Sequence, residues 1–268
     1  MGAMTLDTGL KGKRALITGG ARGIGLAIAS ALAGEGVRLA IGDRDPDPGA
    51  FDELARIAPQ VVPITVDVSR EETAKGMVEE AVSALGGLDL YVNNAGATWH
   101  EPVTRVTSEA FFKTLNTNLA ACVWGAREAA RIMVAARAGA MLIVGSTVRF
   151  CPAYCEGSYR AAKAGLKAYM ETLALELCPF GIRVNMLTPG HYPTRLTAGL
   201  AADKAERLQK EIPMRRFGNT NELGPSALFL LSDRLSSYIT GAELVVDGGL
   251  ALRALAVHSN EEIKNWNL

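Results

Sequence analysis

The feature that most constrains the fold is a short β-prone run followed at once by closely spaced glycines and then by a helix-forming run. These segments are residues 14–18, 19–25 and 26–33. Glycines let the backbone approach a diphosphate, and the amino terminus of the following helix directs free N–H groups at it, so this order is typical of a nucleotide-binding unit. The spacing Thr-Gly-x-x-x-Gly-x-Gly departs from the G-x-G-x-x-G fingerprint, and a glycine turn without a ligand remains the alternative.

The alternation of β-prone and helix-forming runs continues to residue 249. Further strands are predicted at 37–42, 61–66, 88–92, 140–145, 181–187 and 242–246, and helices at 70–85, 108–136, 159–177, 196–217 and 221–231. Ser69, with Glu72 three residues later, is expected to form a capping box. Such a rhythm predicts an α/β fold: a doubly wound, seven-stranded parallel sheet with helices on both faces, Rossmann-like.

We expect one domain over residues 1–268, with 1–10 as a flexible start or tag remnant and 250–268 as a carboxyl-terminal extension. Within that extension, Ser259 and Glu262 suggest a capping box opening a short helix. Our hypothesis is that this tail docks on a neighbouring subunit near its substrate pocket; a disordered or self-packed tail is the alternative.

Composition narrows the class of protein. Twenty-eight basic residues balance 28 acidic ones, which offers no nucleic-acid footprint or membrane anchor. No signal peptide or spanning segment is visible, so a cytoplasmic enzyme is expected. Four sparse cysteines suggest reduced thiols, and Cys151 with Cys155 lacks a second ligand pair for a metal. We therefore expect no metal site.

Asp43 is placed to choose the cofactor, because it ends the second predicted strand eighteen residues after Gly25. A carboxylate there can accept hydrogen bonds from the adenosine ribose and repel a 2′-phosphate, which favours NAD. Arg22 and Arg44 could instead pair with a phosphate, so NADP is the alternative. Asp43 is also a plausible turn residue heading the Asp45–Gly49 loop.

Other strand ends carry residues suited to a dinucleotide. Asp67 could bond the adenine amino group, residues 94–96 could pack against the nucleoside, and Thr194 could lie against the nicotinamide carboxamide. The complete set of predicted cofactor-binding residues is Gly19, Arg22, Gly23, Ile24, Gly25, Asp43, Arg44, Asp67, Val68, Asn94, Ala95, Gly96, Tyr159, Lys163, Pro189, Gly190 and Thr194.

Tyr159 and Lys163 are four residues apart in an alanine-rich helical run, so they share one helix face. An ammonium near a phenol favours the phenolate and could bring proton transfer toward neutral pH. Decoration of a solvated helix is the alternative. Ser146 lies thirteen residues upstream, and a loop can return its hydroxyl to the phenol. Asn118 interrupts a helical run, either by tolerance or as a kink that frees a carbonyl for a water.

Taken together and in order, these motifs resemble the short-chain dehydrogenase/reductase family from Lys11 to Gly249. The resemblance implies that Tyr159 is the general acid/base and that Lys163 lowers its pKa and holds the nicotinamide ribose. It also implies that Ser146 orients the substrate oxygen and that Asn118 holds a water in a proton relay. Gly145 departs from the pattern, since a serine often precedes the active serine.

The resemblance further implies an NAD-dependent oxidoreductase that interconverts a secondary alcohol and a ketone. The substrate is expected to be a polyol, a sugar-derived alcohol or a cyclic alcohol, and the assembly a homotetramer or homodimer. An NADPH-dependent 3-oxoacyl thioester reductase is the alternative, and a non-catalytic dinucleotide-binding regulator is a third reading. The substrate pocket is expected to draw on Trp99, His100, Arg149, Tyr154, Cys155, His191 and Tyr192, although each could simply pack a loop.

Overall fold

A single parallel sheet organises the molecule. The computed structural model describes residues 7–193 and 202–252. The sheet has seven strands in the order β3-β2-β1-β4-β5-β6-β7, every neighbouring pair parallel. The direction of winding reverses between β1 and β4, and a crevice at such a switch point is where open α/β sheets bind ligands. The predicted fold class is confirmed.

Each predicted strand is present, with its ends displaced by at most two residues. The strands are β1 (Arg14–Thr18), β2 (Arg38–Asp43), β3 (Val61–Thr65), β4 (Leu90–Asn93), β5 (Gly139–Val144), β6 (Ile182–Pro189) and β7 (Glu243–Val246).

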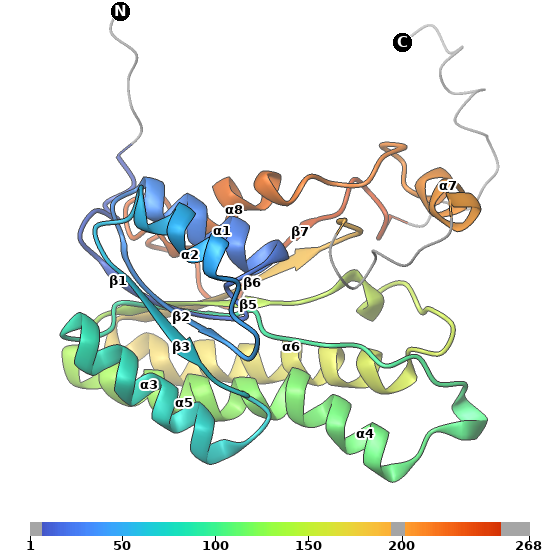
Figure 1. The fold of residues 1–268 in the computed structure, drawn as a ribbon, viewed down its shortest axis with the longest axis horizontal. Coiled ribbons are helices and arrows are strands. Elements are labelled where there is room, and N and C mark those ends of the chain that lie inside the picture. Colours follow the sequence, from blue (N-terminus) through green and yellow to red (C-terminus); the bar gives the residue numbers. More distant parts are fainter. Residues whose placement is uncertain (1–6, 194–201, 253–268) are drawn as a thin grey trace, which may run out of the picture.

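Helices cover both faces of the sheet. Figure 1 shows α1, α2 and α8 on one face, and α3, α5 and α6 on the other. Within the described residues, no helix combines the length and apolar composition that a membrane crossing requires. The helices are α1 (Gly23–Gly34), α2 (Pro48–Ala55), α3 (Glu71–Leu85), α4 (Ser108–Leu115), α5 (Ala121–Ala136), α6 (Gly157–Leu177), α7 (Ala202–Glu211) and α8 (Leu223–Leu231).

Two hydrophobic cores lie on opposite sides of the sheet because side chains alternate along each strand. In β1, Leu16 joins the core beneath α3, α5 and α6, whereas Ala15 and Ile17 join the core beneath α1, α2 and α8. The sheet is buried on both faces, as its nearly continuous apolar strands predict.

Two local expectations were wrong. Residues 8–10 are packed rather than flexible: Leu10 is buried in the second core, and the Thr8 carbonyl accepts a hydrogen bond from the Ser232 hydroxyl. The capping box at α3 is absent, because α3 begins one residue later than expected. Arg70 takes the N-cap position without a side-chain hydrogen bond, and the N–H of Ser69 donates to Asp67 instead.

Of the two interpretations of Asn118, tolerance or a kink, the structure favours an interruption of the helix. Between α4 and α5, residues 116–120 form one turn of π-helix. Asn118 lies in this turn, and its side-chain amide donates 2.9 Å to the Thr114 carbonyl four residues earlier. The amide thus donates a hydrogen bond to a backbone carbonyl at the point where the regular α-helical hydrogen bonds are interrupted.

Candidate active site

The glycine turn after β1 is locked to the loop after β4. The Asn94 side-chain amide donates to the carbonyls of Thr18 and Gly19, at 3.0 and 2.9 Å, and the Thr18 hydroxyl accepts 3.0 Å bonds from the N–H groups of Asn94 and Ala95. The Asn94 amide thus ties the ends of β1 and β4 together. The two loops that flank the switch point therefore form one unit.

Space and backbone geometry require glycine in this turn. Gly19 has φ +63°, and a Cβ on it would lie 2.9 Å from the Cα of Ala95. A Cβ on Gly25 would lie 2.1 Å from the Gly19 carbonyl oxygen, so α1 abuts the turn directly. The α1 N-cap residue, Arg22, makes no side-chain capping bond. Helix N–H groups and an open glycine backbone at one sheet edge fit the diphosphate of a dinucleotide.

Asp43 lies at the end of β2, beside this turn, and is buried. One of its carboxylate oxygens accepts 3.0 Å from the Arg22 guanidinium, and the other accepts 3.3 Å from the N–H of Ala21. Arg22 also pairs with Asp45 at 3.1 Å. Asp43, which favours NAD, and Arg22, which could favour NADP, thus form an ion pair, and the Asp43 carboxylate faces the glycine turn.

The third and sixth strands end at the same edge. Asp67 accepts a 3.0 Å bond from the N–H of Ser69. Although burial favours its protonated form, bonds from Ser69 and the charges of Arg44 and Arg70 hold the pKa of Asp67 below its ordinary value. Val68, next to it, is buried.

Pro189 ends β6, and the N–H of Gly190 donates 3.0 Å to the Val246 carbonyl of β7. A Cβ on Gly190 would lie 2.7 Å from the Cα of Asp247, so this loop is packed closely against the last strand. Thr194, predicted to follow it at the nicotinamide, lies outside the described residues.

Tyr159 and Lys163 share one face of α6, as predicted. The Lys163 ammonium lies 5.8 Å from the centre of the Tyr159 ring, and it donates 3.0 Å to the Val144 carbonyl at the end of β5. The lysine is 4% exposed, whereas the tyrosine keeps part of its surface open. The pair therefore joins the end of β5 to a phenol that is partly open to solvent.

The expected lowering of the Tyr159 pKa is not found. Burial raises the pKa of Tyr159 to about 12, against the opposing hydrogen bond from Ser146, and the negative charge of Glu156 raises it further. Burial also lowers the pKa of Lys163 to about 8. Desolvation thus dominates both groups, and it favours the neutral form of each.

Ser146 and Asn118 flank this pair from two other segments. The Ser146 hydroxyl is close enough to Tyr159 to oppose the rise of its pKa, and it accepts 3.3 Å from the N–H of Val148, which orients it. The Asn118 side chain bonds both polar groups of the Ala97 backbone, donating to the carbonyl at 2.7 Å and accepting from the N–H at 3.2 Å. All four predicted catalytic residues thus come together at the carboxyl edge of the sheet.

Gly96 shows how tightly these residues are arranged. A Cβ at this position would lie 2.7 Å from Oδ1 of Asn118 and 3.8 Å from the Lys163 ammonium. The loop after β4 therefore runs directly over the amide and the lysine, which links the cofactor-side loop to the catalytic side chains.

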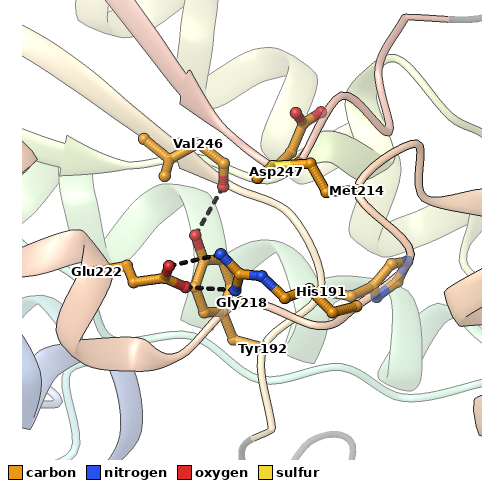
Figure 2. A pocket seen from close by; sticks show the side chains of 9 residues that line it. His191, Tyr192, Met214, Gly218, Glu222, Val246 and Asp247 are labelled. Atoms are coloured by element: carbon orange, nitrogen blue, oxygen red, sulfur yellow. Dashed lines mark hydrogen bonds and ion pairs between the residues drawn. The ribbon is translucent and has the colours of Figure 1, made fainter.

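Two expected substrate residues are held by partners on β7. Tyr192 is 5% exposed, packs in the core, and donates 2.9 Å to the Val246 carbonyl. Figure 2 shows its hydroxyl directed at Val246, in a cavity of about 150 Å³ behind the loop that follows β6. Arg149 pairs with Glu243 of β7. Internal hydrogen bonds and charges hold both groups, and their part in a substrate pocket stays a prediction.

The remaining substrate candidates lie on the three loops that follow β4, β5 and β6 at the carboxyl edge of the sheet, the region that we call the mouth. Trp99 stacks under the Lys113 ammonium at 4.8 Å, Tyr154 is 97% exposed, and the His100 ring nitrogen lies 3.0 Å from the Glu156 carboxylate. His191 packs edge-on against Phe217, and burial lowers its pKa against the charge of Glu156. Cys155 is exposed with φ +63°.

Sequence reasoning missed two residues of this region. Thr18 was seen only as the flank of the glycines, although a hydroxyl at the end of β1 could have suggested an acceptor for the next loop. Glu156 was not singled out, although it stands three residues before Tyr159 and carries the negative charge closest in sequence to the phenol.

Comparison with known proteins agrees with the geometry. A family model described as enoyl-(acyl carrier protein) reductase matches residues 19–251. A 3-oxoacyl-[acyl-carrier-protein] reductase of Chlamydia muridarum is 35% identical, covering 90% of this chain and 98% of the relative. An L-rhamnose 1-dehydrogenase (NAD(P)(+)) of Azotobacter vinelandii is 34% identical, covering 89% and 96%.

A solved short-chain type dehydrogenase/reductase from Mycobacterium marinum has a TM-score of 0.86 and 34% identity, covering 90% of this chain and 96% of that one. The chain belongs to the short-chain dehydrogenase/reductase family. It is accordingly an NAD(P)-dependent oxidoreductase acting on CH–OH groups.

Proposed function

We propose that this protein is an NAD-linked dehydrogenase of a small polar secondary alcohol, a polyol or a sugar-derived alcohol, with Tyr159 as the general acid/base. The observation that carries the proposal is the meeting of Ser146, Tyr159 and the buried Lys163 at the same sheet edge as the glycine turn. A phenol, an orienting hydroxyl and a cation meet there beside a dinucleotide cradle.

The residues would divide the work as follows. The nicotinamide supplies hydride acceptance or donation when bound. The cradle of Gly19, Gly23, Ile24 and Gly25 would hold the diphosphate, and Asp43 the adenosine ribose. Tyr159 would take or give the hydroxyl proton of the substrate at its phenol oxygen. Ser146 would orient the substrate oxygen, and the Lys163 charge would favour the phenolate when the alcohol is oxidised.

Asn118 has a supporting part in this proposal. Its side chain bonds the Ala97 backbone and the Thr114 carbonyl, so it fixes the loop that carries residues 94–97. The amide holds the π-turn open beside Lys163, and a water held at this turn would connect the lysine to solvent.

Asp43 supports NAD, because a buried carboxylate at the end of β2 would repel a 2′-phosphate. Reduction of a 3-oxoacyl thioester with NADPH is the second candidate. It is favoured by relatives named 3-oxoacyl-[acyl-carrier-protein] reductases and by Arg22 beside Asp43. The rhamnose-oxidising relative, 34% identical, supports the sugar-derived alcohol.

We extend the proposal to a cytoplasmic homotetramer or homodimer. All four cysteines are free thiols, which suits a reducing compartment. Ala161, Ala164 and Ala168 form an exposed small-residue stripe on α6, where a second copy could approach closely. Sedimentation velocity measures the assembly, and a monomer at micromolar concentration would refute this part.

Steady-state rates with each cofactor test the function. Purified protein is assayed with NAD across polyols and aldoses, and with NADPH on a 3-oxoacyl thioester. We expect measurable kcat/KM with NAD on at least one polyol or sugar, abolished in Tyr159→Phe while cofactor binding by fluorescence is retained. Thioester reduction with strong NADPH preference and no alcohol oxidation would overturn the proposal in favour of the second candidate.

A further inference from the structure

Glu156 occupies the approach to the phenol. It is the residue immediately before α6, and its carbonyl accepts 2.8 Å from the N–H of Arg160, so its backbone is fixed by the first helical turn. Its side chain is only 20% exposed, which is low for a carboxylate at a loop. A partly desolvated charge three residues from Tyr159 acts more strongly on its surroundings than a solvated one.

The Glu156 side chain is not used to cap the helix. The N-cap position of α6 shows no side-chain hydrogen bond. The carboxylate turns instead to the loop after β4, where it lies 3.0 Å from the His100 ring nitrogen. A second bond joins the same two loops, since the N–H of Glu101 donates 2.9 Å to the Cys155 carbonyl. Glu156 and His100 thus form a pair that spans the mouth from two sides.

The charge of Glu156 reaches across the site. It raises the pKa of the Tyr159 phenol from one side and that of the His191 imidazole, on the loop after β6, from another. Glu156 therefore stands within electrostatic range of the reacting group and of the two loops that face it. A substrate anion entering between these loops meets the same field.

Two nearby arginines are held by other partners. Arg149 is paired with Glu243, and the Arg160 guanidinium donates 3.2 Å to the Arg149 carbonyl. Opposite Glu156 stands the His100 ring, which is half exposed.

We propose that Glu156, paired with His100, determines specificity at this mouth: its carboxylate selects neutral hydroxylated substrates and disfavours those carrying a carboxylate or phosphate near the reacting carbon. This inference rests on the proposed function for its substrate class. The carboxylate can also accept hydrogen bonds from substrate hydroxyls, which a neutral polyol offers and an acyl chain does not.

The test compares matched neutral and anionic substrates. Glucitol and gluconate are oxidised, and ethyl acetoacetate and acetoacetate are reduced, by the unmodified protein and by Glu156→Gln. Each pair differs in one charged group. We expect the variant to raise kcat/KM for the anionic member, relative to the neutral one, by roughly threefold to tenfold at low salt. The gain should shrink at about 0.5 M salt, where surface charges are screened.

Two further variants sharpen the result. Glu176→Gln removes one exposed carboxylate at the far end of α6 and should leave the ratio unchanged. His100→Ala, which removes the partner of Glu156, should lower the relative rate with the anion. An unchanged ratio in Glu156→Gln, or an equal change in Glu176→Gln, would overturn the role of Glu156. Turnover of the ketone pair alone would overturn the proposed polyol function while still measuring this ratio.

Discussion

Arg149 and Glu243 form an ion pair that joins the turn after Ser146 to the last strand of the sheet. The second oxygen of Glu243 accepts 2.6 Å from the Thr188 hydroxyl of β6. The pair therefore connects the serine turn with the strand end that precedes Gly190. It also accounts for Gly145: a Cβ there would lie 2.5 Å from Oγ1 of Thr188, so a serine before Ser146 has no room.

Breaking this pair should loosen the serine turn. Glu243→Gln or Arg149→Met leaves a largely buried partner charge, and each should lower the free energy of unfolding by about 1–3 kcal/mol. The double variant should lose less than the sum, because no charge is stranded. Urea unfolding of the four proteins gives the coupling. Additive effects would show that the ion pair does not act as a unit.

Lys163→Met should stabilise the protein while abolishing activity. The unfolded lysine has a pKa near 10.5 and the folded one about 8, so holding the ammonium in the structure costs about 1–3 kcal/mol at pH 7. Between pH 8 and 10.5 the unfolded chain binds more protons, so this penalty fades as the pH rises. The Tm of the variant should exceed that of the unmodified protein at pH 7, and this difference in Tm should be smaller at pH 10. A lower Tm at pH 7 would contradict the prediction.

Ser146 should set the pH dependence of alcohol oxidation. The rate requires the phenolate of Tyr159; burial raises its pKa to about 12 and the Ser146 bond opposes this. We expect kcat/KM for oxidation to rise with pH through the neutral range, and Ser146→Ala to move that rise to higher pH. Ser146→Thr keeps the hydroxyl and should restore much of the profile. Superimposable profiles for Ser146→Ala and the unmodified protein would count against the bond.

Asp43→Asn should change the cofactor preference. It removes a carboxylate suited to the ribose and releases Arg22 from its 3.0 Å ion pair, so a 2′-phosphate gains a partner. The ratio of kcat/KM for NADP to that for NAD should rise by about tenfold to a hundredfold. The control is Asp45→Asn, which removes the other, exposed carboxylate partner of Arg22 and should change the ratio by less than about twofold. Equal shifts in both variants would refute the role of Asp43.

Much of the fold was predictable because its signals are local. Strand runs, glycines and helix formers recur with a period set by backbone geometry, and the carboxyl ends of parallel strands must meet at one edge. That rule alone brings the ends of β1, β4 and β5 together. An interruption at Asn118 was one of two outcomes that the sequence left open, since an amide within a helical run competes for backbone bonds.

The substrate side was not predictable for the opposite reason. Tyr192 and Arg149 look like pocket residues in sequence, but their side chains are fixed by partners from β7, more than 50 residues away. The importance of Glu156 depends on His100, 56 residues upstream. The pKa of Tyr159 likewise depends on burial, which the four-residue spacing to Lys163 does not reveal.

The π-turn at residues 116–120 makes the site sensitive to chain length as well as to chemistry. Each residue of an α-helix rotates the chain by about 100°, so one residue deleted from this turn would bring α4 and α5 into a single continuous register. The face that carries Asn118 would then rotate away from Ala97 and Lys163, although every side chain of the site remained. The rotational register of this helix, and not only its composition, therefore determines where Asn118 lies in the site.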